Sequence, residues 1–210
     1  MRIVLASNNA KKLGELGGLF APLRLELVTQ GSLGVSEAEE PHLTFIENAL
    51  AKARHAAQAT GLPALADDSG LCVDALGGAP GVQSAVYAPF KPDPGQDREA
   101  QRRAQDEANN ALLLQRLAGV ADRRASFVCA LVAVRAAGDP EPLIAFGRWE
   151  GAILAEPHGE GGFGYDPLMF IPALGSTVAA LPAATKSAHS HRAIAAAHLL
   201  GLMRSAWHLG

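Results

Sequence analysis

Two adjacent carboxylates are the strongest chemical signal in this sequence. Asp67 and Asp68 stand in the stretch Ala66-Asp67-Asp68-Ser69-Gly70, between two apolar segments. Neighbouring carboxylates repel each other and resist burial unless positive charge compensates them. Magnesium is the natural candidate, because it takes one or two carboxylates and completes its shell with water and substrate phosphates. The alternative is an Asx turn, in which a carboxylate only accepts a hydrogen bond from the following backbone.

A second acidic group lies closer to the N-terminus. Glu37, Glu39 and Glu40 precede a helix whose start is marked by a capping-box pattern at residues 44–47. This group is either a solvated loop or a second source of carboxylates for a cation. Lys52 follows on the same helix and is either a surface charge or a point charge suited to phosphate.

Donors suited to phosphate occur at two helix starts. The turn after the first strand contains Ser7, Asn8, Asn9 and Lys12 but lacks the Gly-x-x-x-x-Gly-Lys-Ser/Thr pattern of a P-loop. The last helix opens with Ser190, His191 and Arg192, and Lys186 precedes it. The helix dipole at such a start favours an anion or a carbonyl oxygen. His189 and His191 have no third ligand nearby in the sequence, which argues against a transition-metal site.

The stretch from Gly159 to Gly164 matches the dinucleotide fingerprint Gly-x-Gly-x-x-Gly. That fingerprint needs a preceding strand and a following helix, whereas Tyr165-Asp166-Pro167 follows here and does not begin a helix, so a Rossmann site is excluded. The glycines would let a flat ligand or a phosphate approach closely, and Phe163 and Tyr165 could stack on a base. The alternative is a structural turn with core aromatics.

Composition limits the class of protein. The 210 residues are 49% hydrophobic with a formal net charge of −3, which is typical of a folded protein without a nucleic-acid footprint. Thirteen arginines accompany only five lysines, and Cys72 and Cys129 have neither metal nor disulfide spacing. No run reaches the roughly 18 apolar residues of a membrane span, and residues 2–6 are too few for a signal peptide. We therefore expect a cytoplasmic protein with no membrane or nucleic-acid partner.

These residues need a scaffold of strands and helices to position them. We expect strands at 2–6, 23–29, 63–66, 71–73, 126–134, 142–146 and 149–154, and helices at 11–20, 44–60, 97–117 and from 191 onward. Residues 67–70 are expected to form a polar turn between two short buried strands. The runs 126–134 and 142–146 are expected to pair as an antiparallel hairpin. The fold class is therefore α/β, with a mixed sheet and helices on its faces.

The order and wording of these motifs resemble the inosine triphosphate pyrophosphatase, or Ham1-like, family of nucleotide-pool sanitising enzymes. The matching segments are Thr44-Phe45-Ile46-Glu47-Asn48-Ala49 with Lys52-Ala53, residues 66–71 running into 73–82, residues 161–167, Lys186-Ser187 and Ser190-His191-Arg192. The resemblance implies an elongated mixed β-sheet flanked by helices, with two lobes and a central nucleotide cleft, in a single domain over residues 1–210. It also implies a homodimer.

The same resemblance implies the activity and the site. Family members hydrolyse ITP, dITP and XTP to the monophosphate and pyrophosphate with magnesium. Asp68 corresponds to the proposed proton acceptor and a metal ligand, and Glu40 corresponds to the other metal-associated carboxylate. The substrate contacts correspond to Ser7, Asn8, Asn9, Ala10, Lys11, Lys12, Ser69, Phe163, Gly164, Tyr165, Asp166, Lys186, His191 and Arg192.

The residues can support this reaction, and they leave two other functions open. Glu40 and Asp68, together with Asp67, could hold magnesium against a triphosphate while water attacks the α-phosphorus. Donors from Arg192 would reject adenine, which carries an amino group where hypoxanthine carries an oxygen. One alternative is a broad nucleoside triphosphate pyrophosphatase of the Maf type, which would turn over canonical nucleotides. The other is a nucleotide-binding module, which would bind ITP without releasing pyrophosphate.

Overall fold

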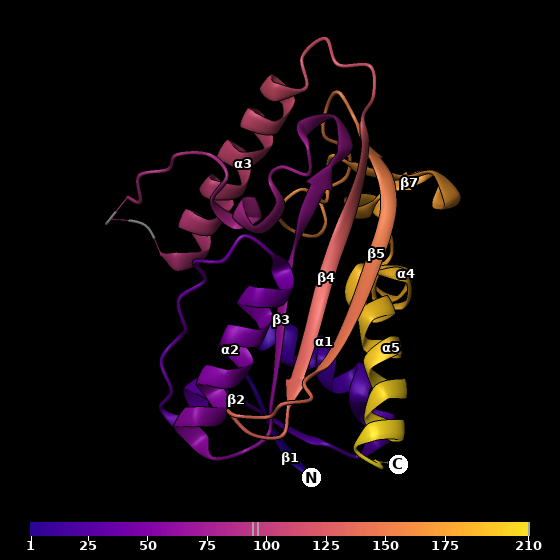
Figure 1. Ribbon diagram of the computed structural model, residues 1–210. Coiled ribbons are helices and arrows are strands. Elements are labelled where there is room, and N and C mark those ends of the chain that lie inside the picture. Colours follow the sequence, from indigo (N-terminus) through magenta and orange to yellow (C-terminus); the bar gives the residue numbers. More distant parts are fainter. Residues whose placement is uncertain (94, 96, 210) are drawn as a thin grey trace. The chain divides into compact units, whose positions relative to one another are not determined.

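The computed structural model describes residues 1–93, 95 and 97–209, without the side chains of Ala10 and Lys11 (Figure 1). Its strands are β1 (Arg2–Leu5), β2 (Glu26–Thr29), β3 (Ala64–Val73), β4 (Arg124–Val134), β5 (Leu143–Ile153), β6 (Met169–Ile171) and β7 (Ser176–Thr177). Its helices are α1 (Ala10–Phe20), α2 (Phe45–Thr60), α3 (Arg98–Arg116), α4 (Ala183–His189) and α5 (His191–Ala206). Within the described residues, none of these helices has the length and apolar composition needed to cross a membrane.

The strands form a seven-stranded sheet in the order β2-β1-β3-β4-β5-β6-β7. β1 pairs in parallel with β2 and β3, whereas β6 pairs antiparallel with β5 and β7. The predicted α/β class, a mixed sheet flanked by helices, is thus confirmed. The chain divides into two compact units. Unit 1 comprises Met1–Ser69, Cys129–Arg148 and His189–Gly210, and unit 2 comprises Gly70–Val128 and Trp149–Ala188.

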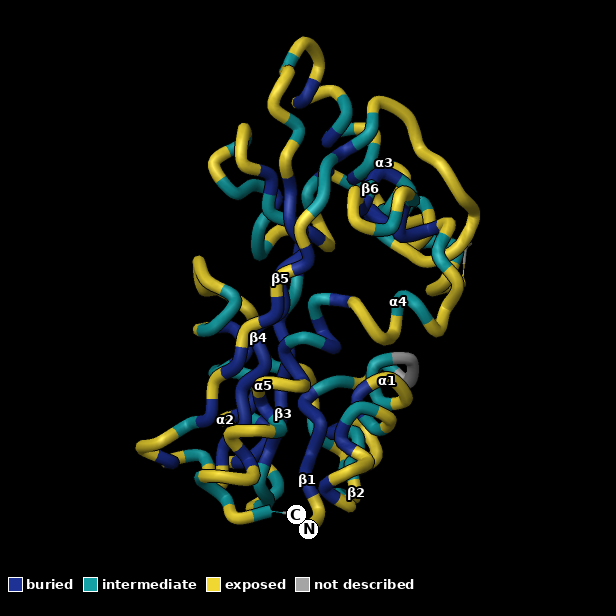
Figure 2. Tube along the Cα trace, turned by 90° about the vertical axis from the view of Figure 1, so that its right-hand side faces the viewer, coloured by how far each residue is buried: buried dark blue, intermediate teal, exposed yellow. Residues whose placement is uncertain are grey.

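In unit 1, successive side chains of each strand point to opposite faces of the sheet, so both faces are apolar. Helices cover both of them. Ile3 and Leu5 of β1 pack with α1 and α5 on one face, and Val4 packs with α2 on the other. The neighbouring strands repeat this alternation, with Leu65, Cys129 and Leu131 on the first face and Ala64, Ala66, Ala130 and Val132 on the second. Figure 2 shows β1, β3 and β4 as buried segments of the trace. Position 67 therefore belongs to the α1–α5 face and position 68 to the α2 face.

Helix α2 begins and ends where the sequence predicts. The Oγ1 of Thr44 accepts a hydrogen bond from the Glu47 backbone N–H at 3.3 Å, and the Thr44 hydroxyl donates to Glu47 Oε2 at 2.7 Å. Gly61 ends the helix at φ 68°, a left-handed conformation that costs glycine little. The side of α2 that faces the sheet is lined by small residues, Ala49, Ala53, Ala56 and Ala57.

In unit 2, helix α3 contributes its apolar side to a separate core. Leu113 and Leu117 at its C-terminal end are buried with Leu71, Phe127 and Trp149 from the strands. Asp97 caps the other end, where its carboxylate accepts a hydrogen bond from the Ala100 N–H at 2.8 Å. The remaining residues of α3 are mostly polar. Two of them, Asp106 and Asn110, contact the loop that precedes β6.

Three predictions about strands are corrected or extended. The polar turn predicted at residues 67–70 is wrong, because these residues lie inside the continuous strand β3. The strand predicted at 23–29 is shorter, because Ala21–Leu23 forms a 3-10 helix before β2. The separate runs at 142–146 and 149–154 form the single strand β5. The hairpin is confirmed, since β4 and β5 are neighbours and run in opposite directions in Figure 1.

Candidate active site

The carboxylate of Asp67 lies on the α1–α5 face of unit 1 and is surrounded by cations. Lys12 Nζ lies 2.9 Å from Asp67 Oδ1, and Arg192 Nη2 lies 3.4 Å from Oδ2. The hydroxyl of Ser69 donates to Asp67 Oδ2 at 3.2 Å. Burial alone would raise the pKa of Asp67, but Lys12 and Arg192 hold it well below its usual range. Asp67 is therefore a fully paired carboxylate that is ionised at neutral pH.

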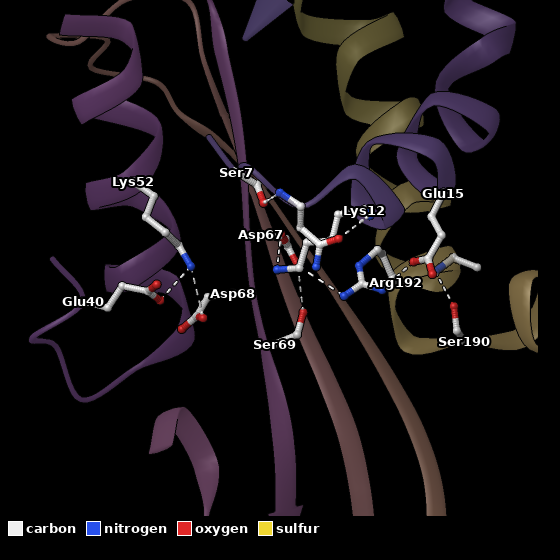
Figure 3. A network of polar contacts seen from close by, with 12 residues as sticks. Ser7, Lys12, Glu15, Glu40, Lys52, Asp67, Asp68, Ser69, Ser190 and Arg192 are labelled. Atoms are coloured by element: carbon white, nitrogen blue, oxygen red, sulfur yellow. Dashed lines mark hydrogen bonds and ion pairs between the residues drawn. The ribbon is translucent and has the colours of Figure 1, made fainter. Parts of the chain in front are cut away.

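Asp68 points to the opposite face and meets a different environment (Figure 3). Lys52 Nζ of α2 lies 3.2 Å from Asp68 Oδ1 and 2.7 Å from Glu40 Oε2, so two carboxylates share one ammonium. Burial, with added repulsion from Glu40, raises the pKa of Asp68 to about 6 despite the attraction of Lys52. The interpretation of Lys52 as a mere surface charge is wrong, because its side chain is only 11% exposed.

Asn48 ties the acidic segment to Asp68. Its Nδ2 donates to Asp68 Oδ2 at 3.2 Å and to the His42 carbonyl at 3.3 Å, and its Oδ1 accepts from the His42 N–H at 3.0 Å. The side chain is buried and one helical turn before Lys52, so both residues project from the same side of α2. Asn48 thus fixes the backbone just after Glu40 and orients the Asp68 carboxylate.

The donor set around Asp68 fits a magnesium ion. Within the described residues, no three His, Cys, Asp or Glu side chains gather to hold a metal by themselves. Magnesium, however, needs only one or two carboxylates, with water and phosphate oxygens as its other ligands. Glu40 and Asp68 already converge on one cationic position, the Lys52 ammonium, and burial with repulsion from Glu40 raises the pKa of Asp68 despite that ammonium. These two carboxylates are the candidate metal ligands.

The turn after β1 is held by its own polar side chains. Ser7 Oγ accepts from the Asn9 N–H at 3.2 Å, and Asn9 Oδ1 accepts from the Lys12 N–H at 3.3 Å. Asn8 Nδ2 donates to Glu37 Oε1 at 3.2 Å, which links the turn to the acidic segment. The side chains of Ala10 and Lys11, two further predicted contacts, lie outside the described part of the chain. Among the predicted residues of this turn whose side chains are described, Lys12 contacts Asp67.

The start of α5 brings Arg192 into the same network. Ser190 caps the helix by accepting from the Ala193 N–H at 3.2 Å, and His191 is the first helical residue. Arg192 is buried, and its Nη1 lies 2.7 Å from Glu15 Oε2 of α1. Its Nε is buried without a hydrogen-bond partner among the described residues. Arg192 therefore joins α1, β3 and α5 through Glu15 and Asp67.

The remaining predicted residues lie in unit 2, in the loop before β6 and in α4. Asp166 pairs with Lys186, and its Oδ2 also accepts from the Phe163 N–H at 2.9 Å. Burial raises the pKa of Asp166 although Lys186 opposes this shift. Lys186 Nζ also lies 4.7 Å from the centre of the Phe163 ring, which is 51% exposed. Phe163 thus keeps the exposed aromatic surface that a stacked base requires.

Two expectations about this loop are corrected. Tyr165 cannot offer its ring for stacking, because the ring is buried and its hydroxyl donates to the Ser84 carbonyl at 2.9 Å. Three of the nearby glycines, Gly159, Gly161 and Gly162, lie against protein, whereas a Cβ on Gly164 would meet nothing within 4 Å. A Cβ on Gly159 or Gly161 would meet the backbone of residues 179–180 at 2.7 Å, and one on Gly162 would collide with the Asp166 side chain. Close internal packing therefore explains these glycines.

Four residues that contact the predicted site were not singled out from the sequence: Glu15, Asn48, Asp106 and Asn110. Asn48 had a usable signal, since it stands four residues before Lys52 on a well-marked helix. Glu15 shares the polar side of α1 with Lys12 in a similar way. Asp106 and Asn110 belong to a helix with many polar residues, where no local pattern separates a buried contact from a solvated one.

Strand β3 thus carries two carboxylates with lysines and an arginine around them in an α/β protein. The chain belongs to the Ham1 family, whose family model matches residues 3–202. The resemblance inferred from the sequence is thus confirmed.

Full-length relatives and solved structures agree with this assignment. A protein from Leptothrix cholodnii named dITP/XTP pyrophosphatase is 70% identical over 211 residues, covering 100% of both chains. One of the same name from Methylibium petroleiphilum is 72% identical over 207 residues, covering 99% of each. The structure of a HAM1 protein from Coxiella burnetii superposes with a TM-score of 0.88 at 42% identity, covering 98% of this chain and 100% of that one.

Proposed function

We propose that this protein hydrolyses non-canonical purine nucleoside triphosphates, namely ITP, dITP and XTP, to the nucleoside monophosphate and pyrophosphate. The observation that carries this proposal is the full-length match with relatives named dITP/XTP pyrophosphatase. The site supports it, because unit 1 combines cations for phosphate with a partly compensated carboxylate pair. By this reaction the protein would remove damaged nucleotides from the cellular pool.

Glu40 and Asp68 are the proposed ligands of magnesium, which when bound would neutralise charge on the triphosphate. Asp68 is also the proposed base that orients the attacking water or accepts its proton. Lys52 and Asn48, each 3.2 Å from an oxygen of the Asp68 carboxylate, would hold it in place for this role. Lys12 and Lys52 lie beside the two carboxylates and would compensate the negative charge that develops as pyrophosphate leaves.

The proposed substrate contacts are the residues around these carboxylates in unit 1 and the exposed ring of Phe163, with Asp166 and Lys186, in unit 2. Hypoxanthine and xanthine carry an acceptor oxygen where adenine carries an amino donor. The Arg192 Nε is a donor without a partner within the described residues, whereas Nη1 and Nη2 bond Glu15 and Asp67. We propose this Nε as one of the groups that discriminate against adenine, because a mismatch would leave a buried donor unpaired.

The test is pyrophosphate release from ITP, dITP, XTP, ATP and GTP, with and without magnesium. We expect magnesium-dependent release from the first three nucleotides and little from ATP and GTP. Comparable turnover of ATP and GTP would instead indicate a broad pyrophosphatase. Binding of ITP without any release would indicate a nucleotide-binding module. We further propose that the protein works in the cytoplasm and forms a homodimer. Light scattering on the purified protein would test the dimer.

A further inference from the structure

We propose that Asp106 and Asn110 of α3 are positioning residues that hold the Phe163–Asp166 loop for substrate. This role rests on the proposed function, since it assigns the loop a contact with the nucleotide. All residues involved lie in unit 2. The proposal starts from Gly164, the residue of the loop whose two backbone polar groups are both bound by side chains of one helix.

Helix α3 contacts Gly164 through two hydrogen bonds of opposite direction. The carboxylate of Asp106 accepts a hydrogen bond from the Gly164 N–H at 2.9 Å, and the amide of Asn110 donates to the Gly164 carbonyl at 2.9 Å. Residues four apart on a helix project from the same side, so α3 presents one acceptor and one donor together. Gly164 has φ +60°, a left-handed conformation that few other residues adopt without strain.

The orientation of Asn110 comes at a cost that an apolar residue would avoid. Its Oδ1 is buried without a hydrogen-bond partner within the described residues, while its Nδ2 serves Gly164. A buried unpaired carbonyl oxygen is destabilising. The hydrogen bond to Gly164 therefore has to offset this cost. A need to hold the loop in one position would account for an asparagine at this place.

Gly164 is adjacent to the residues that would meet a nucleotide. Phe163 precedes it with its half-exposed ring beside Lys186, and Asp166 follows with its ion pair to the same lysine. The Phe163 N–H and Asp166 close this short loop by a hydrogen bond of 2.9 Å. Tyr165 is buried and anchors the loop to the core, because its hydroxyl donates to the Ser84 carbonyl. The α3 contacts therefore hold the backbone between Phe163 and Asp166 at Gly164.

Isosteric substitutions separate this role from simple loss of volume. Asn110→Asp removes the donor and places a carboxylate against the Gly164 carbonyl, and Asp106→Leu removes the acceptor. Asp106→Asn keeps an acceptor oxygen for the Gly164 N–H and should therefore retain most of the activity that Asp106→Leu loses. Glu107→Gln removes an exposed charge from the next position of the same helix and is the matched control.

The kinetic test compares KM, kcat and the ratio of kcat/KM for dITP and dGTP in these variants. We expect Asn110→Asp and Asp106→Leu to raise the KM for dITP about tenfold, the size expected for a lost charge-assisted or buried hydrogen bond, with kcat within about threefold. Asp106→Asn and Glu107→Gln should stay near the unmodified protein. Equal KM values in Asn110→Asp and Glu107→Gln, or a loss confined to kcat, would overturn the positioning role.

A second measurement does not depend on catalysis. Hydrogen exchange followed by mass spectrometry, on a peptide spanning residues 161–168 without nucleotide, should be faster in Asn110→Asp and Asp106→Leu than in Glu107→Gln. Unchanged exchange in both variants would overturn the proposal even if the protein is active. An unmodified protein that releases no pyrophosphate would instead refute the proposed function, while the exchange comparison still decides whether α3 holds the loop.

Discussion

Asp67 and Asp68 are neighbours in the sequence, but the two faces of the sheet give them opposite properties. On the α1–α5 face, Lys12 and Arg192 surround Asp67, and the pKa of this carboxyl is lowered. On the α2 face, Asp68 shares Lys52 with Glu40, and its pKa is raised to about 6. The difference arises because consecutive strand residues point to opposite faces, so each carboxylate meets the charges of different helices.

Under the proposed function, Asp67 would stabilise the site and Asp68 would take part in the chemistry. A carboxylate paired with two cations has no reason to take up a proton or a metal. A carboxylate that competes with Glu40 for one ammonium gains from an added cation. Substitutions that remove one charge at a time should therefore give different results on the two faces.

The largest effect on activity is expected from Asp68→Asn. The amide keeps the shape of the side chain but cannot accept a proton or ligate magnesium as a carboxylate does. We expect kcat for dITP to fall by about two orders of magnitude or more, the scale of losing a general base. Pyrophosphate release under saturating magnesium measures it, and near-normal turnover would refute the role of Asp68.

The same variant should not lose stability. Because the pKa of Asp68 is raised from 3.8 to about 6 in the folded protein, its ionised form opposes folding at neutral pH. Removing that charge should leave the free energy of unfolding unchanged or higher when no metal is present. Urea unfolding in EDTA at pH 7 tests this, and a marked destabilisation would show that Lys52 fully compensates the charge of Asp68.

Asp67→Asn should do the reverse and destabilise the protein. It leaves Lys12 and Arg192 without their buried carboxylate, and breaking a buried pair from one side costs about 3 kcal/mol or more. The midpoint of urea unfolding should therefore fall clearly below that of Asp68→Asn. If Asp67→Asn is as stable as the unmodified protein, the two faces do not differ in the way proposed.

The same two residues show what could be predicted from the sequence. Helix α2 was predicted to within a residue, because Thr44, Glu47 and Gly61 are local signals at its two ends. The mixed sheet is also predicted, as are the two carboxylates and the cations Lys12, Lys52 and Arg192 as residues of interest. The segment with Asp67 and Asp68 is predicted as a turn, because the neighbouring sequence does not reveal the distant cations that allow a strand to bury two carboxylates.

The missing information was long-range in each case. Lys12, Lys52 and Arg192 lie 55, 16 and 125 residues from the carboxylates that they contact. No local pattern assigns Asp67 to one of them and Asp68 to another, although strand alternation would have separated the two carboxylates once a continuous strand was assumed. Tyr165 was misjudged for the same reason, since its partner Ser84 lies 81 residues away.

A smaller effect is expected from replacing lysine by arginine on the cationic side of the comparison. Lys12→Arg and Lys186→Arg keep the charge, but a planar guanidinium replaces a compact ammonium that suits phosphate as a point charge. We expect kcat/KM for dITP to fall about tenfold in each variant, with Asp67 still paired and stability retained. Lys91→Arg, at an exposed lysine, is the control. Unchanged kinetics in both variants would show that the five lysines reflect composition alone.

The smallest effect is expected at Asn48, which acts on the Asp68 face alone. Asn48→Ala removes the hydrogen bond to Asp68 and the two hydrogen bonds that hold the His42 backbone next to the Glu40 segment. Both proposed metal ligands then lose part of their orientation while their charges stay in place. The magnesium concentration for half-maximal activity should rise about threefold, as expected for weakened rather than lost ligation. Gln58→Ala, at an exposed position of the same helix, should leave it unchanged. A magnesium dependence identical in the two variants would mean that Asn48 serves only the fold and that the Asp68 face needs no help from α2 beyond Lys52.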